Sequence, residues 1–185
     1  MLDEIYGELK DRMDKTLEAL RRELGHLRTG KASPKLLDGV TVEAYGSKMP
    51  LNQLATIGVP EPRLLTVQPY DHSQLRAIEK ALLASDLGIT PNNDGSIIRL
   101  PIPALNEERR KEYVKLAKKY SEEAKVALRN KRRDANDKIK KAESDSDISE
   151  DEAHRGQDKV QKLTDEYVAK IDEILEAKEK EIMEV

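Results

Sequence analysis

The feature that most constrains this chain is a narrow apolar stripe, repeated at steps of three and four residues in two widely separated parts of the sequence. This heptad-like spacing predicts amphipathic helices that need partner helices to cover the stripe. The first such helix should end near Arg28, because Gly30 and Pro34 follow. The N-terminal stripe consists of Leu2, Ile5, Leu9, Met13, Leu17, Leu20, Leu24 and Leu27.

The same spacing returns in the second half of the chain. Asn106 is a candidate N-cap for a second long helix, which a polar break at 144–149 ends. Ser149 and Glu152 fit a capping box at the start of a third helix. The two stripes are Tyr113, Ala117, Tyr120, Ala124, Leu128, Ala135, Ile139 and Ala142, then Val160, Leu163, Tyr167, Ile171, Ile174, Leu175 and Ile182.

The segment between these helices has a different composition. All eight prolines lie between Pro34 and Pro103. Short runs rich in β-branched and aliphatic residues at 40–45, 64–67 and 97–100 predict strands bounded by turns. A helix capped by Ser73 should lie between the second and third of these strands. The segment therefore predicts a small α+β module.

The economical architecture is an α+β fold: an elongated, antiparallel three-helix bundle of residues 1–29 and 106–185, with an α+β domain of residues 30–105 inserted at one end. A thin body of this kind needs little core, which agrees with 37% hydrophobic and 3% aromatic residues. Two crossings with few large residues predict a hinge, although their prolines could instead make a rigid junction. The predicted hinge residues are Thr29, Gly30, Lys31, Pro101, Pro103, Ala104 and Leu105.

Several classes of protein are excluded by the composition. A chain without cysteine has no disulfide scaffold, zinc ribbon or thiol nucleophile. No apolar run approaches the ~18 residues that a membrane span needs. The acidic, amphipathic N-terminus is neither a signal peptide nor a transit segment. We therefore expect a soluble protein of a reducing compartment, with no membrane partner.

Three partial motifs carry no chemistry. Residues 25–32 match most of the phosphate-loop pattern, but Ala32 replaces the hydroxyl residue that binds magnesium, and the segment follows a predicted helix. The acidic run 145–151 lacks the turn glycine of a calcium loop. The histidines at 26, 72 and 154 have no metal-ligand spacing. We expect no metal, no cofactor and no enzymatic activity.

The second long helix carries a concentrated positive charge. Residues 107–141 contain 14 basic and 7 acidic residues, a net charge of +7. A narrow wedge of this helix, which we call the basic row, should present Lys118, Lys125, Arg129, Arg132 and Asn136 away from the apolar stripe. A rigid line of arginines and lysines matches a phosphate backbone, although a solvated helix face would have the same pattern. Few aromatic residues lie nearby, which favours recognition of RNA shape and backbone over base reading.

Several longer strings resemble one family, in order and over essentially the whole chain. The strings are Arg28–Pro34 (RTGKASP), Ser85–Gly88 (SDLG), Asp94–Leu100, Glu107–Glu112 (EERRKE), Val126–Asp137 (VALRNKRRDAND), Ile148–Glu152 and Gln161–Asp165. In these strings the sequence is similar to bacterial ribosome recycling factors, also called ribosome-releasing factors. Two positions depart from the family pattern: Tyr70 replaces its usual Trp, and Asn106 replaces a Thr.

The resemblance implies an L-shaped molecule of transfer-RNA size, with a β/α/β domain inserted into a three-helix bundle through flexible linkers. It implies a cytoplasmic, monomeric translation factor that binds rRNA of the large ribosomal subunit. With elongation factor G, which hydrolyses the GTP, such a factor splits post-termination ribosomes and releases mRNA and deacylated tRNA. The alternatives are a structural or adaptor bundle that binds RNA or partner helices, and a nuclease. The predicted RNA-binding residues are Arg110, Lys118, Lys125, Arg129, Arg132, Arg133 and Asn136.

Overall fold

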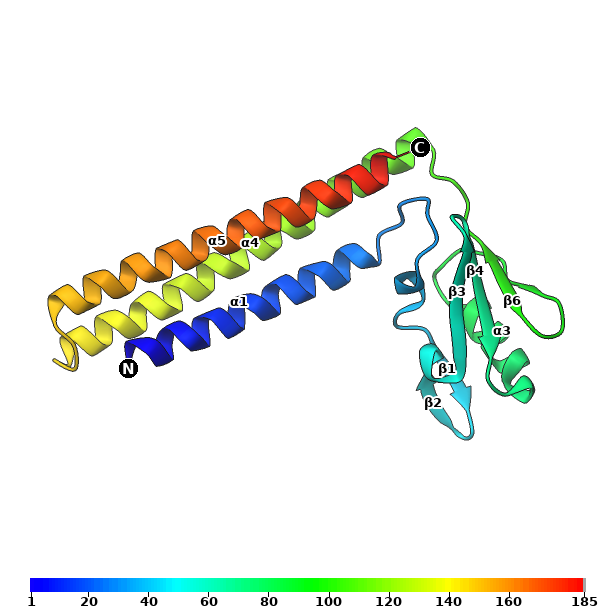
Figure 1. The fold of residues 1–185 in the computed structure, drawn as a ribbon, viewed down its shortest axis with the longest axis horizontal. Helices are drawn as coiled ribbons and strands as arrows, with labels where there is room; N and C mark the ends of the chain where they lie inside the picture. Colours follow the sequence, from blue (N-terminus) through cyan, green and yellow to red (C-terminus); the bar gives the residue numbers. More distant parts are fainter. Residues whose placement is uncertain (185) are drawn as a thin grey trace. The chain divides into compact units, whose positions relative to one another are not determined.

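The computed structural model describes residues 1–184, which pack into two compact units (Figure 1). The helical unit comprises Met1–Leu24 and Val114–Glu181. The inserted unit comprises Gly25–Tyr113 together with the C-terminal residues from Ile182. All three boundaries fall inside helices, so residues 25–29, 106–113 and 182–184, which the sequence places in the bundle, group with the inserted unit.

The helical unit is built from three long helices that run alternately up and down (Figure 1). They are α1 (Leu2–Gly25), α4 (Glu107–Ser144) and α5 (Glu150–Met183). Their predicted apolar stripes are confirmed, because most of the stripe residues are buried, and the others, Leu2, Ile5, Tyr113, Tyr120, Ile174 and Leu175, are half-buried. Alanines make up much of the stripe on α4, where only Leu128 and Ile139 are large buried residues. The best-buried members are Leu9, Met13, Leu128, Ile139, Tyr167 and Ile171.

The ends of the helices follow the predicted capping chemistry. The side-chain oxygen of Asn106 accepts the N–H of Arg109 at 2.7 Å, and Ser149 Oγ accepts the N–H of Glu152 at 3.1 Å. Acidic residues fill the first turns of all three helices, where the helix dipole favours negative charge. The first helix ends at Gly25, three residues before the predicted Arg28.

One buried hydrogen bond fixes the position of α5 against α1. The Tyr167 hydroxyl, on a side chain that is 1% exposed, donates to Asp14. Burial and the neighbouring Asp14 carboxylate raise the pKa of Tyr167 well above its usual value, so the phenol stays protonated. Because a donor on α5 has to meet an acceptor on α1, this bond selects one register of the two helices.

The inserted unit contains two antiparallel sheets. One pairs β1 (Thr41–Ala44) with β2 (Ser47–Pro50). The other has the strand order β3-β4-β6-β5. Its strands are β3 (Ala55–Glu61), β4 (Leu64–Pro69), β5 (Asn92–Asn93) and β6 (Ile98–Pro101). The helices are α2 (Leu51–Leu54) and α3 (Leu75–Ala84), with 3₁₀ turns at Pro34–Leu37 and His72–Gln74.

The core of this unit is aliphatic. Val42, Leu65, Val67, Ile98 and Leu100 contribute strand side chains that are 0% exposed, and α3 adds Ile78 and Leu82. The three predicted strands are confirmed as β1, β4 and β6. The predicted cap at Ser73 is wrong, since Asp71 accepts the N–H of Ser73 at 3.0 Å and starts a 3₁₀ turn before α3.

The turn between β5 and β6 is organised by one carboxylate. Asp94 accepts the backbone N–H groups of Ile97 at 2.8 Å and Ser96 at 3.0 Å, and it pairs with Arg99 at 2.5 Å. These donors, the backbone groups first, hold the pKa of Asp94 well below its usual value. Its stabilising effect is therefore present above the pKa of an unfolded Asp, near 4, and decreases as the pH falls further.

Within the described residues 1–184, no helix combines the length and the apolar character that a membrane crossing requires.

Candidate nucleic-acid interface

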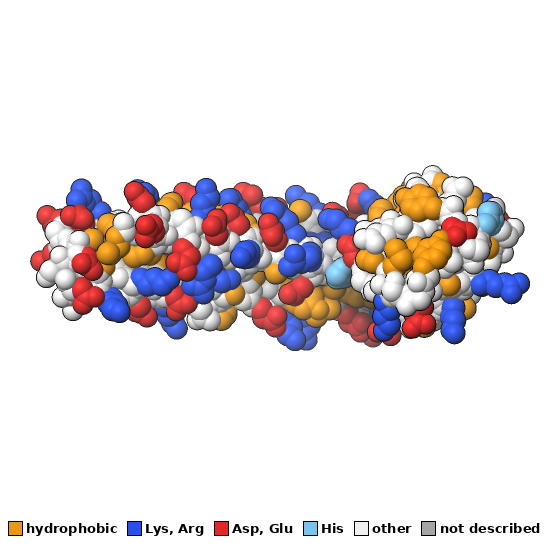
Figure 2. Space-filling model, turned by 90° about the horizontal axis from the view of Figure 1, so that it is seen from below, with side chains coloured by type: hydrophobic (Ala, Val, Ile, Leu, Met, Phe, Trp, Pro, Cys, Tyr) orange, Lys and Arg blue, Asp and Glu red, His pale blue; other side chains and the backbone are white. Residues whose placement is uncertain are grey.

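The basic row lies along one side of α4. Because one helix carries all its members, the spacing between them is fixed, and Lys118 and Asn136 lie roughly 27 Å apart along the helix axis. The outward face of α4 also presents Arg133, which is exposed. Figure 2 shows basic and acidic side chains interspersed along the helical unit, so the face in view carries no uniform positive patch.

Arg129 is the most accessible arginine of the row. Its side chain is exposed, and within the described chain it has neither an ion pair nor a hydrogen bond. A guanidinium offers five N–H donors in a planar fork that suits phosphate oxygens. Arg129 and its neighbour Arg133 can therefore meet an incoming anion without first breaking a contact inside the protein.

Arg132 is half-buried at the edge of the seam between α4 and α5, and its orientation is set by α5. Its Nη1 donates to Gln161 Oε1 at 3.3 Å, and Gln161 Nε2 in turn donates to Asp165 at 2.9 Å. This chain of bonds fixes which way the Gln161 amide points. Only one of the five guanidinium donors is used, so Arg132 is oriented while most of its donors stay available.

Lys125 does not fit the predicted role of an open RNA contact. Its ammonium lies 2.6 Å from Asp172 on α5 and 3.5 Å from Glu122, and only 15% of its side chain is exposed. The hydrogen bond to Asp172 is the main reason that its pKa is raised. Lys125 therefore ties α4 to α5. Lys118, in contrast, is 62% exposed and lies at the limit of ion-pair distance, 3.9 Å, from Glu179.

The row is closer to the helix seam than the sequence predicts. Lys125 and Arg132 contact α5, and Asn136 has a buried Oδ1 atom without a hydrogen-bond partner. The physical reason is that the wedge which holds these residues borders the apolar stripe instead of lying opposite to it. Arg110, near the start of α4, is half-buried and belongs to the inserted unit.

The two predicted hinge segments lie outside regular secondary structure, except for Pro101. Residues 26–31 follow α1, and residues 102–106 precede α4. Both segments are held at the same turn: the N–H of Ala32, the residue after the first segment, donates to Pro62 O, and the Ile102 N–H donates to Arg63 O, each at 2.7 Å. Pro101 belongs to β6 and pairs with Leu64, so the second segment begins only after it.

The two segments approach each other at Gly30. This residue has φ +79°, a conformation that favours glycine, and a Cβ added to it would lie 3.6 Å from the backbone nitrogen of Leu105. Residues 26–32 therefore form a turn after α1, which is not the strand–loop–helix of a phosphate loop. Within residues 1–184, no three His, Cys, Asp or Glu side chains lie together as metal ligands would.

Comparisons with known proteins give one consistent result. The sequence model of the ribosome recycling factor family matches residues 20–183. The chain is 59% identical to the ribosome-recycling factor of Carboxydothermus hydrogenoformans and 58% identical to that of Bacillus subtilis, with 100% of both chains covered in each case. A solution structure of ribosome recycling factor superimposes with a TM-score of 0.80 at 44% identity, covering 100% of this chain and 98% of the other.

A second solved structure has a TM-score of 0.70 at 49% identity and covers 99% of each chain. It contains models of the T. thermophilus ribosome recycling factor and the E. coli elongation factor G bound to the E. coli post-termination complex. The fold, the charged long helix and these relatives define a translation factor, and not an enzyme. The chain belongs to the ribosome recycling factor family.

Proposed function

We propose that this protein binds the post-termination ribosome and, with elongation factor G and GTP, splits it into subunits, so that mRNA and deacylated tRNA leave. The observation that carries the proposal is the match to ribosome-recycling factors over the whole length of the chain, at 59% identity. The solved complex of a relative at 49% identity contains the same two partners, the post-termination complex and elongation factor G. The protein acts in the cytoplasm, where ribosomes recycle, and as a monomer.

Helix α4 supplies the contact to ribosomal RNA. Arg129 and Arg133 are exposed, Arg132 is oriented by Gln161, and Lys118 keeps most of its side chain in solvent. These side chains, with Arg110 and Asn136 at the two ends, bind backbone phosphates of the large-subunit rRNA. Lys125 contributes indirectly, because its ion pair with Asp172 holds α4 against α5.

The segments 26–31 and 102–106 act as the hinge through which elongation factor G moves the inserted unit. Two features support this role: these residues lack regular structure, and both segments are anchored to the β3–β4 turn on the side of the inserted unit. A force applied to that unit would then be transmitted through these two short segments. The energy comes from GTP bound by the partner.

The direct test is sedimentation of post-termination ribosomes with this protein, elongation factor G and GTP. We expect conversion of 70S particles to free subunits that requires all three components. Omission of GTP or of elongation factor G should leave the 70S peak intact. If the complete mixture leaves the 70S peak unchanged while a known recycling factor converts the same particles to subunits, the proposed function is wrong.

The hinge is tested by Gly30→Ala. The alanine has to adopt φ +79° or change the path of the chain, and the first option costs about 1 kcal/mol. We expect a several-fold lower rate of subunit splitting, with ribosome affinity changed less than twofold. Gly39→Ala is the matched control, because Gly39 has φ +85° and open space around it but lies outside both hinge segments. Equal losses of splitting in the two variants would contradict control by the hinge.

A further inference from the structure

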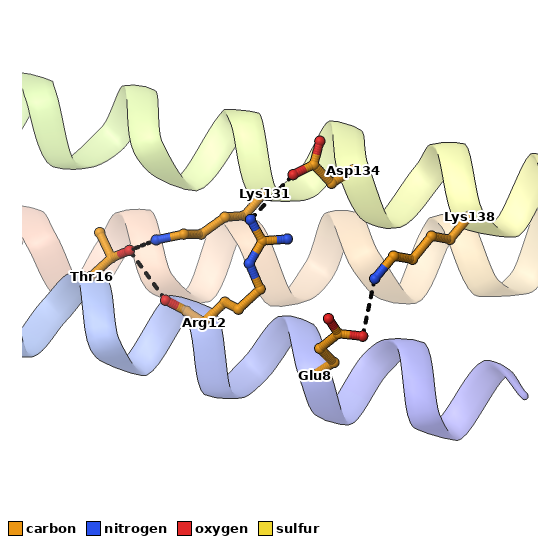
Figure 3. Close-up of polar contacts among 6 residues, drawn as sticks. All are labelled: Glu8, Arg12, Thr16, Lys131, Asp134 and Lys138. Carbon is orange, nitrogen blue, oxygen red and sulfur yellow. Dashed lines mark hydrogen bonds and ion pairs between the residues drawn. The ribbon is translucent and has the colours of Figure 1, made fainter.

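The edge where α1 packs beside α4 carries a second group of cations (Figure 3). Two of these cations are paired across the two helices. Arg12 lies 3.2 Å from Asp134, and Lys138 lies 3.0 Å from Glu8. Lys131 is the third cation of the group. The five charged residues therefore leave one positive charge without a carboxylate.

Lys131 has a single partner, and that partner is neutral. Its ammonium donates to the hydroxyl of Thr16, which itself donates to the backbone oxygen of Arg12 at 3.2 Å (Figure 3). Thr16 is 8% exposed, so this hydroxyl is a fixed acceptor inside the helix contact. An ammonium has three donors, and within residues 1–184 no carboxylate lies within ion-pair distance of Lys131.

The surroundings of Lys131 disfavour its positive charge. Burial is the main cause of a lowered pKa, and the nearby Arg12 guanidinium lowers the pKa further. A partly desolvated charge with one neutral hydrogen bond is poorly compensated, and buried charges in proteins are normally paired with an opposite charge. An anion at this point would supply the missing charge and accept from the remaining donors.

There is room for such an anion. Lys131 and Thr16 lie at one end of a groove of about 310 Å³ between α1 and α4, whose lining includes Ala19, Ala124 and Ala127. The groove also contains Lys15 and two carboxylates, Glu23 and Glu123. These carboxylates are seven residues from Thr16 on α1 and eight from Lys131 on α4, or roughly 10 and 12 Å along the helices. They therefore lie away from the Lys131 end.

We propose that Arg12, Thr16 and Lys131 form an anion-binding position that takes one backbone phosphate of the ribosomal RNA. This inference rests on the proposed function and extends its contact surface to the α1 side of α4. A phosphodiester carries one negative charge, which matches the one positive charge that the five charged residues leave without a carboxylate, and its two free oxygens can accept from Lys131 and Arg12 together. Arg12 can serve both Asp134 and a phosphate because its side chain is 38% exposed and its fork has five donors.

The first experiment measures affinity for the large ribosomal subunit over a range of salt concentrations for Lys131→Met and Lys131→Arg. We expect Lys131→Met to bind roughly fivefold more weakly at about 100 mM salt and to lower the salt slope by about one, because one phosphate contact is lost. Lys131→Arg should keep the slope. The matched control is Lys138→Met, which removes a cation of the same helix edge that Glu8 already neutralises. A slope for Lys131→Met equal to that of wild type would overturn the proposal.

The second experiment does not need the ribosome. Lysines of the full-length protein are reductively methylated with ¹³C, and the Lys131 signal is assigned by its absence in Lys131→Arg. We expect inorganic phosphate to shift this signal and raise the pKa of Lys131, while the Lys138 signal stays in place. No response to phosphate would overturn the anion position even if recycling is normal. A phosphate response in a protein that fails to split ribosomes would leave the position standing and defeat the proposed function alone.

Discussion

The variant Arg129→Glu/Arg132→Glu is expected to bind the large ribosomal subunit at least ~100-fold more weakly than wild type at about 100 mM salt. Each substitution removes one phosphate contact and places a carboxylate against the RNA backbone, so attraction becomes repulsion at two points of the row. The salt slope should decrease by two or more. Arg129 contributes as an exposed group with no internal partner, and Arg132 as a group that Gln161 orients.

The control for this variant is Lys10→Glu/Lys162→Glu, which changes the net charge by the same amount at exposed positions of α1 and α5. If only the total charge matters, both variants will lose affinity equally, and the basic row will have no special role. Helix content measured by circular dichroism should stay the same in both variants, since none of the four residues belongs to the apolar stripes. If the helix content of the double variant falls, affinity is measured for Arg129→Glu and Arg132→Glu separately.

Much of the helical unit could be predicted from the sequence because its determinants are local. The spacing of apolar residues identified all three helices, and the caps at Asn106 and Ser149 were predicted from single side chains. The inserted unit was harder. Strand β3 contains Gly58 and Pro60, which are rare inside strands, and it forms only because β4 pairs with it over Ala55–Gly58.

The candidate site shows which features depend on tertiary packing and not on the local sequence. The sequence pattern places Lys125 and Arg132 on one wedge and does not distinguish them. The packing of α5 decides that Lys125 has an anionic partner, Asp172, whereas Arg132 has a neutral one, Gln161. In the same way, nothing local distinguishes Lys131 from Lys138. The difference arises because α1 offers Glu8 to one and Thr16 to the other. Helical periodicity identifies the charged face, and tertiary neighbours determine which charges are available for binding.

The largest loss of stability is expected from Leu128→Ala. Leu128 is 0% exposed at the centre of the stripe of α4, where the neighbouring stripe positions are alanine and serine and leave little to fill a cavity. Removing its side chain should cost about 2–5 kcal/mol. The inserted unit has its own core, and Ile98→Ala, also at a side chain that is 0% exposed, should cost a comparable amount there.

Hydrogen exchange followed by mass spectrometry can assign each loss to a unit. We expect Leu128→Ala to speed exchange in peptides of α1, α4 and α5 while β4 and β6 keep their protection, and Ile98→Ala to do the reverse. Faster exchange in both units of either variant would mean that the two cores unfold as one. That result would count against the hinge as well, because a unit that moves about residues 26–31 and 102–106 has to remain folded without support from the bundle.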